Sequence, residues 1–304
     1  MEIGIQVVGG YDHVRLIGQM CENAGIAAVA LADHYLYGSD ESAWSQPAYD
    51  SLVQAAALAR DTSSVEIVML VSPITFRHPA VYAKTVTTID EISDGRFVFG
   101  IGTGWHEGEH DVFGFEFGTL SERFEWLEDA LGYLRVFLDD PTQGYSGRFW
   151  SLKGLDINPR ARTDLRLMVG GGGAVKTPTL VGRFADEYNL YRHEEADVSA
   201  RLDVMRSAAV EAGRDPDAIF LSTSYPVIGG DDDAEFDAFF GDVASRQGMT
   251  VEQVKDRLSR VPRRSWDEHA EELQRLATLG FDRTYLQVVA NVPWAAERAL
   301  ERLA

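Results

Sequence analysis

The stretch that decides the fold is Phe97-Val98-Phe99-Gly100-Ile101-Gly102-Thr103-Gly104-Trp105. Its first five residues carry no polar side chain and predict a strand that is buried on both faces, as in a parallel sheet. Gly102 and Gly104 then open a loop where the backbone can approach a ligand closely, since glycine has no Cβ. A helical run from Pro79 to Ser93 precedes this strand, and Asp94-Gly95-Arg96 separates the two. The unit is therefore a helix and a strand that end in a glycine-rich loop.

The same alternation of helix and strand continues in both directions along the chain. Apolar runs predict eight strands, at residues 3–8, 26–32, 65–71, 97–101, 165–169, 187–191, 219–227 and 283–289. Eight such strands in 304 residues match a (β/α)8 TIM barrel, which we expect to form a single domain over 1–304. The polar, helical segment 231–264 is interpreted as an insertion in this barrel. A doubly wound open sheet is the alternative, but Val8-Gly9-Gly10-Tyr11 lacks the G-x-G-x-x-G pattern.

Two local predictions accompany this outline. Pro47 is expected to open a helix that ends near Arg60, because proline suits the first helical turn. Residues 145–150 are expected to form a hairpin with its turn at Ser146-Gly147.

Composition excludes several classes of protein. The formal net charge is −20, so nucleic acid and anionic membrane surfaces should repel the chain. The single cysteine, Cys21, excludes an intramolecular disulfide and lies on an apolar helix stripe, which predicts a buried thiol in a cytoplasmic protein. No apolar run approaches about 18 residues, so we expect no membrane span, and the first residues show no signal-peptide pattern.

Barrel enzymes place their active sites at the carboxyl ends of the strands. This rule selects Asp33-His34, Thr103-Gly104-Trp105 and the run Gly170, Gly171, Gly172, Gly173. N–H groups of the four-glycine turn, at the start of a helix, could hold a phosphate, whereas the alternative is tight packing or a flexible loop. His34 could donate a proton or orient a ring, or it could be satisfied by a neighbouring helix cap. Trp105 could stack on a ring system or fill the barrel mouth.

Two further groups of polar residues lie near these strand ends. His106, Glu107, Glu109 and His110 have the composition of a metal site, but no third, distant ligand accompanies them as a zinc-binding helix requires, so we expect no metal. Arg77 is expected to pair with an acid at the rim. The glycine loops together indicate an enzyme that holds a large, phosphate-bearing aromatic cofactor.

In this order the motifs resemble the bacterial luciferase-like superfamily of flavin and deazaflavin oxidoreductases. The resemblance covers nearly the whole chain and rests on segments 31–34, 76–79, 93–96, 100–105 with Glu109, 147–149 and 169–173. It implies a (β/α)8 barrel with a cofactor ring at its mouth. Within the family, the chain looks most like the branch that uses the deazaflavin coenzyme F420.

The resemblance also implies roles for individual residues. His34 would lie near the hydride-carrying carbon, a cis peptide bond would join Leu70 to Val71 behind the ring, and the four glycines would hold the phosphate. Trp105 stands where the sugar-phosphate dehydrogenases of the branch carry glutamate, so it would shape a different substrate pocket. The residues implied to contact the cofactor are Asp33, His34, Leu70, Val71, Thr103, Gly104, Gly170, Gly171, Gly172 and Gly173.

We therefore expect an oxidoreductase that transfers hydride between F420 and a small organic substrate, with His34, Asp33 and Trp105 as its catalytic residues. The alternatives are an FMN-dependent luciferase-like monooxygenase and a non-catalytic flavin- or deazaflavin-binding protein on the same barrel. No nucleic acid or membrane partner is expected, and the family resemblance implies a homodimer. The loop from Leu36 to Gln46 and the segment 231–264 are expected to fold over the mouth, and they do not identify the substrate.

Overall fold

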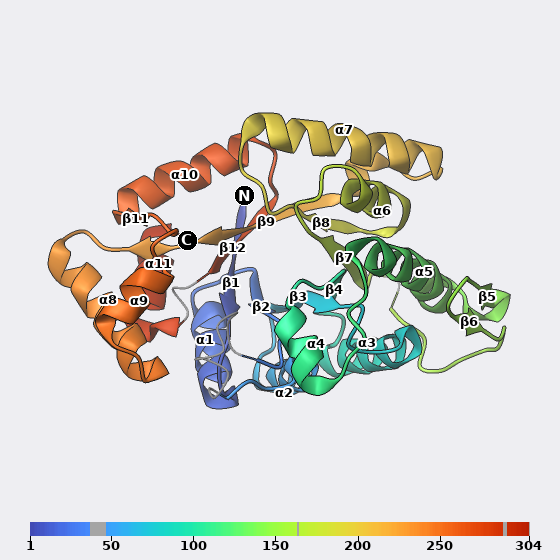
Figure 1. Cartoon of the computed structure of the whole chain (residues 1–304), viewed down its shortest axis with the longest axis horizontal. Coiled ribbons are helices and arrows are strands. Elements are labelled where there is room, and N and C mark those ends of the chain that lie inside the picture. Colours follow the sequence, from blue (N-terminus) through green and yellow to red (C-terminus); the bar gives the residue numbers. More distant parts are fainter. Residues whose placement is uncertain (37–46, 163, 288–290, 304) are drawn as a thin grey trace.

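The computed structural model describes residues 1–36, 47–162, 164–287 and 291–303. Eight parallel strands close into a barrel in the spatial order β1-β12-β9-β8-β7-β4-β3-β2 (Figure 1). This confirms the predicted (β/α)8 barrel. The strands are β1 (Glu2–Val7), β2 (Ala28–Leu31), β3 (Glu66–Pro73), β4 (Phe97–Gly102), β7 (Arg166–Gly170), β8 (Glu187–Asn189), β9 (Phe220–Pro226) and β12 (Arg283–Gln287).

Helices surround this barrel and, in Figure 1, form an outer ring around the strands. They are α1 (Tyr11–Asn23), α2 (Ser51–Asp61), α3 (Pro79–Ser93), α4 (Glu107–Phe113), α5 (Leu120–Asp139), α6 (Lys176–Phe184), α7 (Glu195–Glu211), α10 (Trp266–Thr278) and α11 (Pro293–Leu303). The segment interpreted as an insertion carries α8 (Asp233–Gln247) and α9 (Val251–Arg257). It ends in β11 (Arg263–Arg264), a short strand that pairs with β10 (Ile228–Gly229).

Helix α3 shows how local sequence sets these boundaries. Pro79 occupies its first turn, and the ring Nδ1 of His78 accepts a hydrogen bond from the Ala80 N–H at 3.0 Å. Asp94 and Gly95 then take positive φ angles of 55° and 83°, which end the helix before β4 begins. The predicted limits of α3, Pro79 and Ser93, are therefore correct.

One local prediction was wrong, and a second was correct except for the position of its turn. Pro47 does not open a helix, because the Asp50 side chain accepts hydrogen bonds from Leu52 and Val53 and starts α2 at Ser51. The hairpin pairs β5 (Tyr145–Ser146) with β6 (Ser151–Leu152), so its loop is 147–150. The Asp129 carboxylate holds this wider loop by accepting from the N–H groups of residues 148, 149 and 150. The predicted end of the eighth strand, at residues 288–289, lies outside the described residues, as does most of the loop from Leu36 to Gln46.

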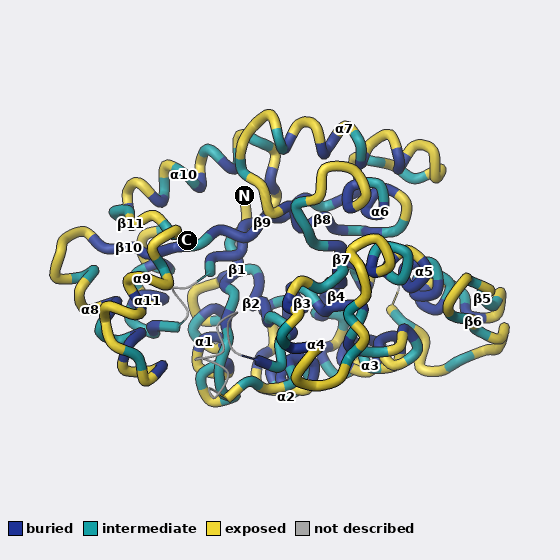
Figure 2. Tube along the Cα trace, viewed as in Figure 1, coloured by how far each residue is buried: buried dark blue, intermediate teal, exposed yellow. Residues whose placement is uncertain are grey.

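The buried hydrophobic side chains form three clusters. Figure 2 shows the buried strands enclosed by helices with exposed outer faces. The largest core lies between strands and helices and includes Cys21, whose pKa burial raises to about 12, as expected for an inert buried thiol. A smaller cluster that includes Ala28, Val68, Met168 and Tyr285 fills the barrel interior. A third cluster forms around Phe239 and Phe240 of α8 and includes Ile228, Val292 and Ala295 from outside segment 231–264.

Charged residues occupy the amino-terminal end of the barrel. Arg283 pairs with Glu2 and with Glu66, and Arg166 pairs with Glu66 and Glu187. This network closes the end of the barrel opposite the candidate site, which suits a stabilising role. Among the helices of the described ranges, none has the length and apolar character needed to cross a membrane.

Candidate active site at the barrel mouth

His34 lies just beyond the end of β2 and is held by a buried acid from a distant helix. Its ring Nδ1 lies 3.0 Å from Oε2 of Glu109, which is fully buried in α4. Oε1 of Glu109 accepts from the backbone N–H groups of Tyr35, at 2.6 Å, and Leu36, at 2.9 Å. Burial alone would raise the pKa of Glu109, but His34 and the two N–H groups outweigh it and lower that pKa. Glu109 is therefore a carboxylate that fixes both the His34 ring and the chain that carries it.

The bond to Glu109 also determines which ring nitrogen of His34 remains for chemistry. A carboxylate only accepts hydrogen bonds, so Nδ1 must carry a proton and donate it. Nε2 has no hydrogen-bond partner within the described ranges. Of the two alternatives for His34, the neighbouring helix cap is wrong, because its partner is a side chain 75 positions away in the chain.

Asp33 lies beside His34 but belongs to a buried ion cluster. Its Oδ2 accepts from Ser72 Oγ and from the Arg77 guanidinium, each at 2.6 Å. The other end of Arg77 bonds to Asp50, also at 2.6 Å. Burial alone would lower the pKa of Arg77, but the two acids raise it, so this guanidinium stays charged. The expected pairing of Arg77 with an acid is confirmed, and Asp33 is turned toward this cluster.

The peptide bond between Leu70 and Val71 is cis, as the family resemblance implies. The pairing of β3 with β4 shifts register between Met69 and Ser72, so the strand bulges at this point. A Cβ on Gly170 would lie 2.9 Å from Val71 Cγ1, and one on Gly102 would lie 3.1 Å from Val71 Cγ2. The Val71 side chain therefore lies directly over glycines of β4 and β7, which leave a flat, apolar platform.

The four-glycine turn follows β7 at the same end of the barrel as Asp33. Gly171 has φ 148°, which disfavours a side chain, and its N–H donates to the Asn189 carbonyl at 3.0 Å. A Cβ on Gly173 would lie 2.7 Å from the Thr177 hydroxyl oxygen, and one on Gly172 would lie 3.2 Å from Nε of Arg192. Helix α6 begins just after the turn, and no side chain caps its start. An uncapped helix start with a hydroxyl and a cation nearby suits a phosphate group.

The remaining predicted residues lie on the loop between β4 and α4. Thr103 is half-buried, and Gly104 takes φ 78° where a Cβ would lie 3.1 Å from Cβ of Pro73. Trp105 is 61% exposed, and its ring meets the His34 ring edge-on at a centroid distance of 5.5 Å. It is thus a rim aromatic beside His34 and does not fill the mouth.

The histidines and acids at 106–110 have structural partners. His110 bonds to the His106 carbonyl at 2.8 Å and to the Thr75 hydroxyl at 2.6 Å, and burial lowers its pKa. The Glu109 carboxylate accepts hydrogen bonds from His34 and from two backbone N–H groups. Within the ranges that the structure describes, no group of three or more histidine, cysteine, aspartate or glutamate side chains could hold a metal ion.

Reasoning from the sequence missed two kinds of site residue. The first is the role of Glu109, which was quoted only as part of a motif. The second is a pair of inward-facing amides, Gln6 and Asn189, near the ends of β1 and β8; a third amide, Gln287 at the end of β12, bonds to Gln6. Alternation along β8 could have found Asn189, because it lies two residues after the buried Glu187 on the same face. These amides make one side of the mouth polar, whereas Val71 makes the other apolar.

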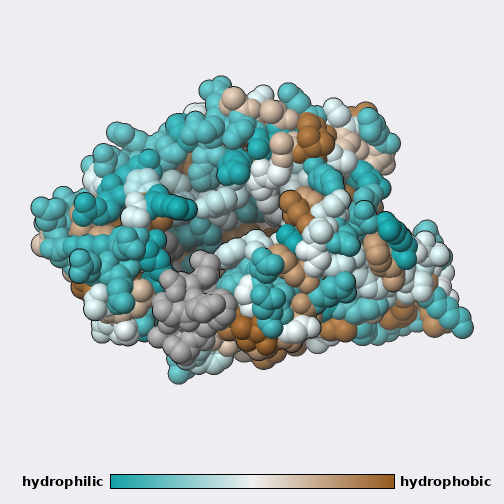
Figure 3. Space-filling model, viewed as in Figure 1, coloured by the Kyte–Doolittle hydropathy of each residue, from teal (hydrophilic) through white to brown (hydrophobic). Residues whose placement is uncertain are grey.

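The molecular surface around these residues is open. The face shown in Figure 3 is hollowed near its centre, over the strands. A cavity of about 240 Å3 adjoins His34 at the ends of β1 and β2. A parallel barrel whose mouth carries a histidine held by a buried acid, an apolar platform and a glycine turn defines an α/β-barrel protein with a preformed binding site.

Comparison with known proteins places this barrel in a family. Residues 4–277 match the family described as luciferase-like monooxygenase, so the chain belongs to the luciferase-like monooxygenase family. A pyrimidine monooxygenase from Pseudomonas savastanoi pv. phaseolicola is 30% identical over 124 residues, which is 40% of this chain and 34% of that protein. An F420-dependent glucose-6-phosphate dehydrogenase from Microbacterium testaceum is 28% identical over 214 residues, 69% of this chain and 62% of that one.

The chain therefore spans from about a third to less than two thirds of the length of these two relatives. Among solved structures, an F420-dependent secondary alcohol dehydrogenase in complex with an F420–acetone adduct superimposes with a TM-score of 0.81. The match covers 99% of this chain and 97% of that one at 17% identity, so it supports the fold alone.

Proposed function

We propose that the protein is an oxidoreductase that transfers hydride between coenzyme F420 and a small organic substrate. The observation that carries this proposal is the His34–Glu109 pair at the open mouth, next to a platform shaped by Val71 and its neighbouring glycines. The similarity to an F420-dependent dehydrogenase over 69% of the chain supports the same choice of coenzyme.

The residues at the mouth fit the parts of such a coenzyme. The bulge at Leu70 and Val71 would support the flat ring system, because glycines beneath it leave no side chain in the way. Thr103 and Gly104 would line the ring edge, and the turn from Gly170 to Gly173 with the start of α6 would hold the phosphate. The bound deazaflavin would supply or accept the hydride.

The chain's own contribution would be orientation, exclusion of water and movement of one proton. With Nδ1–H held by Glu109, the doubly protonated ring of His34 carries its second proton on Nε2 and can give that proton to the substrate atom that gains an electron pair. The substrate would then have gained a hydride and a proton, and water would restore the proton to His34. Oxidation would run through the same atoms in reverse. Asp33 would act through the loop that carries His34, since Arg77 and Ser72 already occupy its carboxylate.

Titration of the purified protein with F420 and with FMN, followed by absorbance, tests the choice of coenzyme. F420 is expected to bind, and tight FMN binding without F420 binding would overturn the proposal. The matched variants His34→Ala and His34→Asn test the proton transfer, since asparagine keeps a donor toward Glu109 but lacks the second ring nitrogen. Both are expected to lower turnover roughly 100-fold or more while coenzyme affinity stays within a few-fold.

The second candidate is an FMN-dependent monooxygenase, which the family description and the 30% identity to a pyrimidine monooxygenase favour. Oxygen consumption coupled to oxidation of reduced FMN would distinguish it. The third hypothesis is a non-catalytic coenzyme-binding protein. It would be supported if F420 binds and the parent protein shows no turnover with any acceptor tried.

A further inference from the structure

Two adjoining cavities occupy the side of the mouth formed by β1 and β2. The inner cavity, of about 240 Å3, reaches His34 and Ala32. The outer cavity, of about 200 Å3, lies between the loop after β1 and helix α8 of the insertion. The two share four lining residues: Val8, Gly9, Pro47 and Tyr49. A single elongated molecule could therefore extend along this shared wall from α8 to His34.

The inner cavity has little polar surface to offer a ligand. Its side chains are mainly aliphatic, and its polar members are engaged elsewhere: Ser51 donates to the Ala32 carbonyl at 2.6 Å, and the Gln54 amide donates to the Gly9 carbonyl at 2.8 Å. The remaining polar groups of its lining are the His34 ring and the Tyr49 hydroxyl. Such a lining favours the hydrocarbon part of a ligand.

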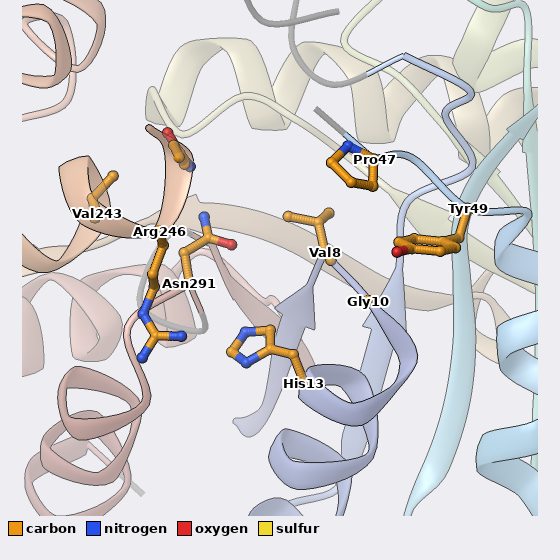
Figure 4. A pocket seen from close by; sticks show the side chains of 10 residues that line it. Val8, Gly10, His13, Pro47, Tyr49, Val243, Arg246 and Asn291 are labelled. Carbon is orange, nitrogen blue, oxygen red and sulfur yellow. The ribbon is translucent and has the colours of Figure 1, made fainter. Parts of the chain in front are cut away.

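The outer cavity carries a cation. Arg246 of α8 is its one Lys or Arg lining side chain among the described residues, in a chain whose net charge is −20. Nε of Arg246 donates to Asp242 at 3.1 Å, one turn earlier on α8, and its two terminal amino groups have no hydrogen-bond partner within the described ranges. Asp242 therefore fixes the guanidinium and leaves its outer edge available. In Figure 4 Arg246 and Asn291 lie along one side of the cavity, the guanidinium extends to the level of His13 across from it, and Val8 lies beyond Asn291.

We propose that the substrate is a small carboxylate with an apolar body. Its carboxylate would pair with the free edge of Arg246 and the Asn291 amide, and its body would extend through the inner cavity to place the reacting carbon beside His34. This inference rests on the proposed function and names its substrate class. It also fits the strand order of the barrel, since β1 lies four strands from β7 in either direction, so the cavity after β1 and the four-glycine turn after β7 lie on opposite sides of the mouth.

The test uses hexanoate and hexanamide, which share a hydrocarbon chain and differ in charge. Dissociation constants for the full chain without coenzyme are measured by ligand-observed NMR. The parent is expected to bind hexanoate at least about tenfold more tightly than hexanamide. Arg246→Gln should remove this preference, and Arg246→Lys should retain part of it. Arg260→Gln removes the same charge from an exposed position in the insertion and should change nothing.

Three results would overturn the proposal: equal binding of the two probes by the parent, an Arg246→Gln variant that keeps its preference, or an equal loss in Arg260→Gln. Circular dichroism and the thermal midpoint establish that each variant is folded. A separate F420 titration distinguishes the two levels of the argument. Hexanoate preference without F420 binding would overturn the choice of coenzyme alone, and F420 binding without hexanoate preference would overturn the substrate class alone.

Discussion

Two substitutions of Glu109 separate its structural contribution from its effect on His34. Glu109→Ala removes an acceptor of three hydrogen bonds, at 3.0, 2.6 and 2.9 Å, and leaves their donors without a partner. Each hydrogen bond to a buried charge contributes about 1.5–3 kcal/mol. Because water can replace the carboxylate as the partner of the half-exposed His34, we expect the free energy of unfolding to fall by about 4 kcal/mol. Glu109→Gln keeps one oxygen for both backbone N–H groups, and we expect a loss of only about 1–2 kcal/mol.

The glutamine variant should also change the protonation of His34. Its amide nitrogen would face Nδ1, which must then accept, so the ring proton moves to Nε2. Chemical shifts of the ring nitrogens in 15N-histidine-labelled protein report this directly. The neutral ring of the parent is expected to carry its proton on Nδ1 and that of the variant on Nε2, and turnover is expected to fall in the variant.

Denaturant unfolding measures the stability terms, and Glu107→Gln, an exposed acid on the same first turn, should stay within about 0.5 kcal/mol of the parent. Equal losses for Glu109→Ala and Glu109→Gln would refute the role of the shared oxygen. A neutral ring with its proton on Nε2 in the parent would refute the carboxylate's control of His34.

Four further outcomes follow from the same structure. Arg77→Leu leaves the carboxylate of Asp33 buried without its cation and should lower the free energy of unfolding by about 3–5 kcal/mol in denaturant titrations; a loss below 1 kcal/mol would contradict the buried ion pair. Gly170→Ala should cost about 1–3 kcal/mol and weaken coenzyme binding, whereas Gly241→Ala, with open space around it in α8, should be neutral or stabilising. Because folding lowers the pKa of Glu109, its contribution is present above its unfolded pKa and lost as pH falls, so the stability gap between parent and Glu109→Gln should shrink from about pH 6 to pH 3; a constant gap would contradict this. Sedimentation velocity at micromolar concentration should show a homodimer, and a monomer alone would contradict the family expectation.

The barrel could be predicted because its strands are buried on both faces and read as unbroken apolar runs. β4, Phe97–Gly102, is fully buried, and the apolar run that predicted it begins at the correct residue. Two boundaries were misplaced, for different reasons. Asp50 started α2 four residues after Pro47, and Asp129, from α5, held the hairpin loop open. Asp50 is a local N-cap signal that Pro47 outweighed in the prediction, whereas the contact of Asp129 with the distant loop leaves no local pattern in the sequence.

The site was only partly predictable for a similar reason. The rule that chemistry lies at strand ends located His34 and the glycine turn, because it depends on topology. The partner of His34 could not be found that way, since α4 has seven residues and Glu109 lies 75 positions from His34. A short helix of this kind has too few apolar positions for a periodic pattern. The spacing of acids that resembled a metal cluster is explained by this single carboxylate and by the hydrogen bonds of His106 and His110.

The end of β3 connects the two halves of the mouth. Ser72 bonds to Asp33 and so belongs to the side that carries His34, while the preceding Val71 lies over glycines of β4 and β7. Successive side chains of a strand point to opposite faces, and a bulge changes that relation at one position. The register shift between Met69 and Ser72 therefore lets adjacent residues serve the ion cluster and the platform at once. A side chain at Gly170 would displace Val71, and the shift would pass through the neighbouring Ser72 to the ion cluster around Asp33. We therefore expect stability and coenzyme binding to fall together in Gly170→Ala.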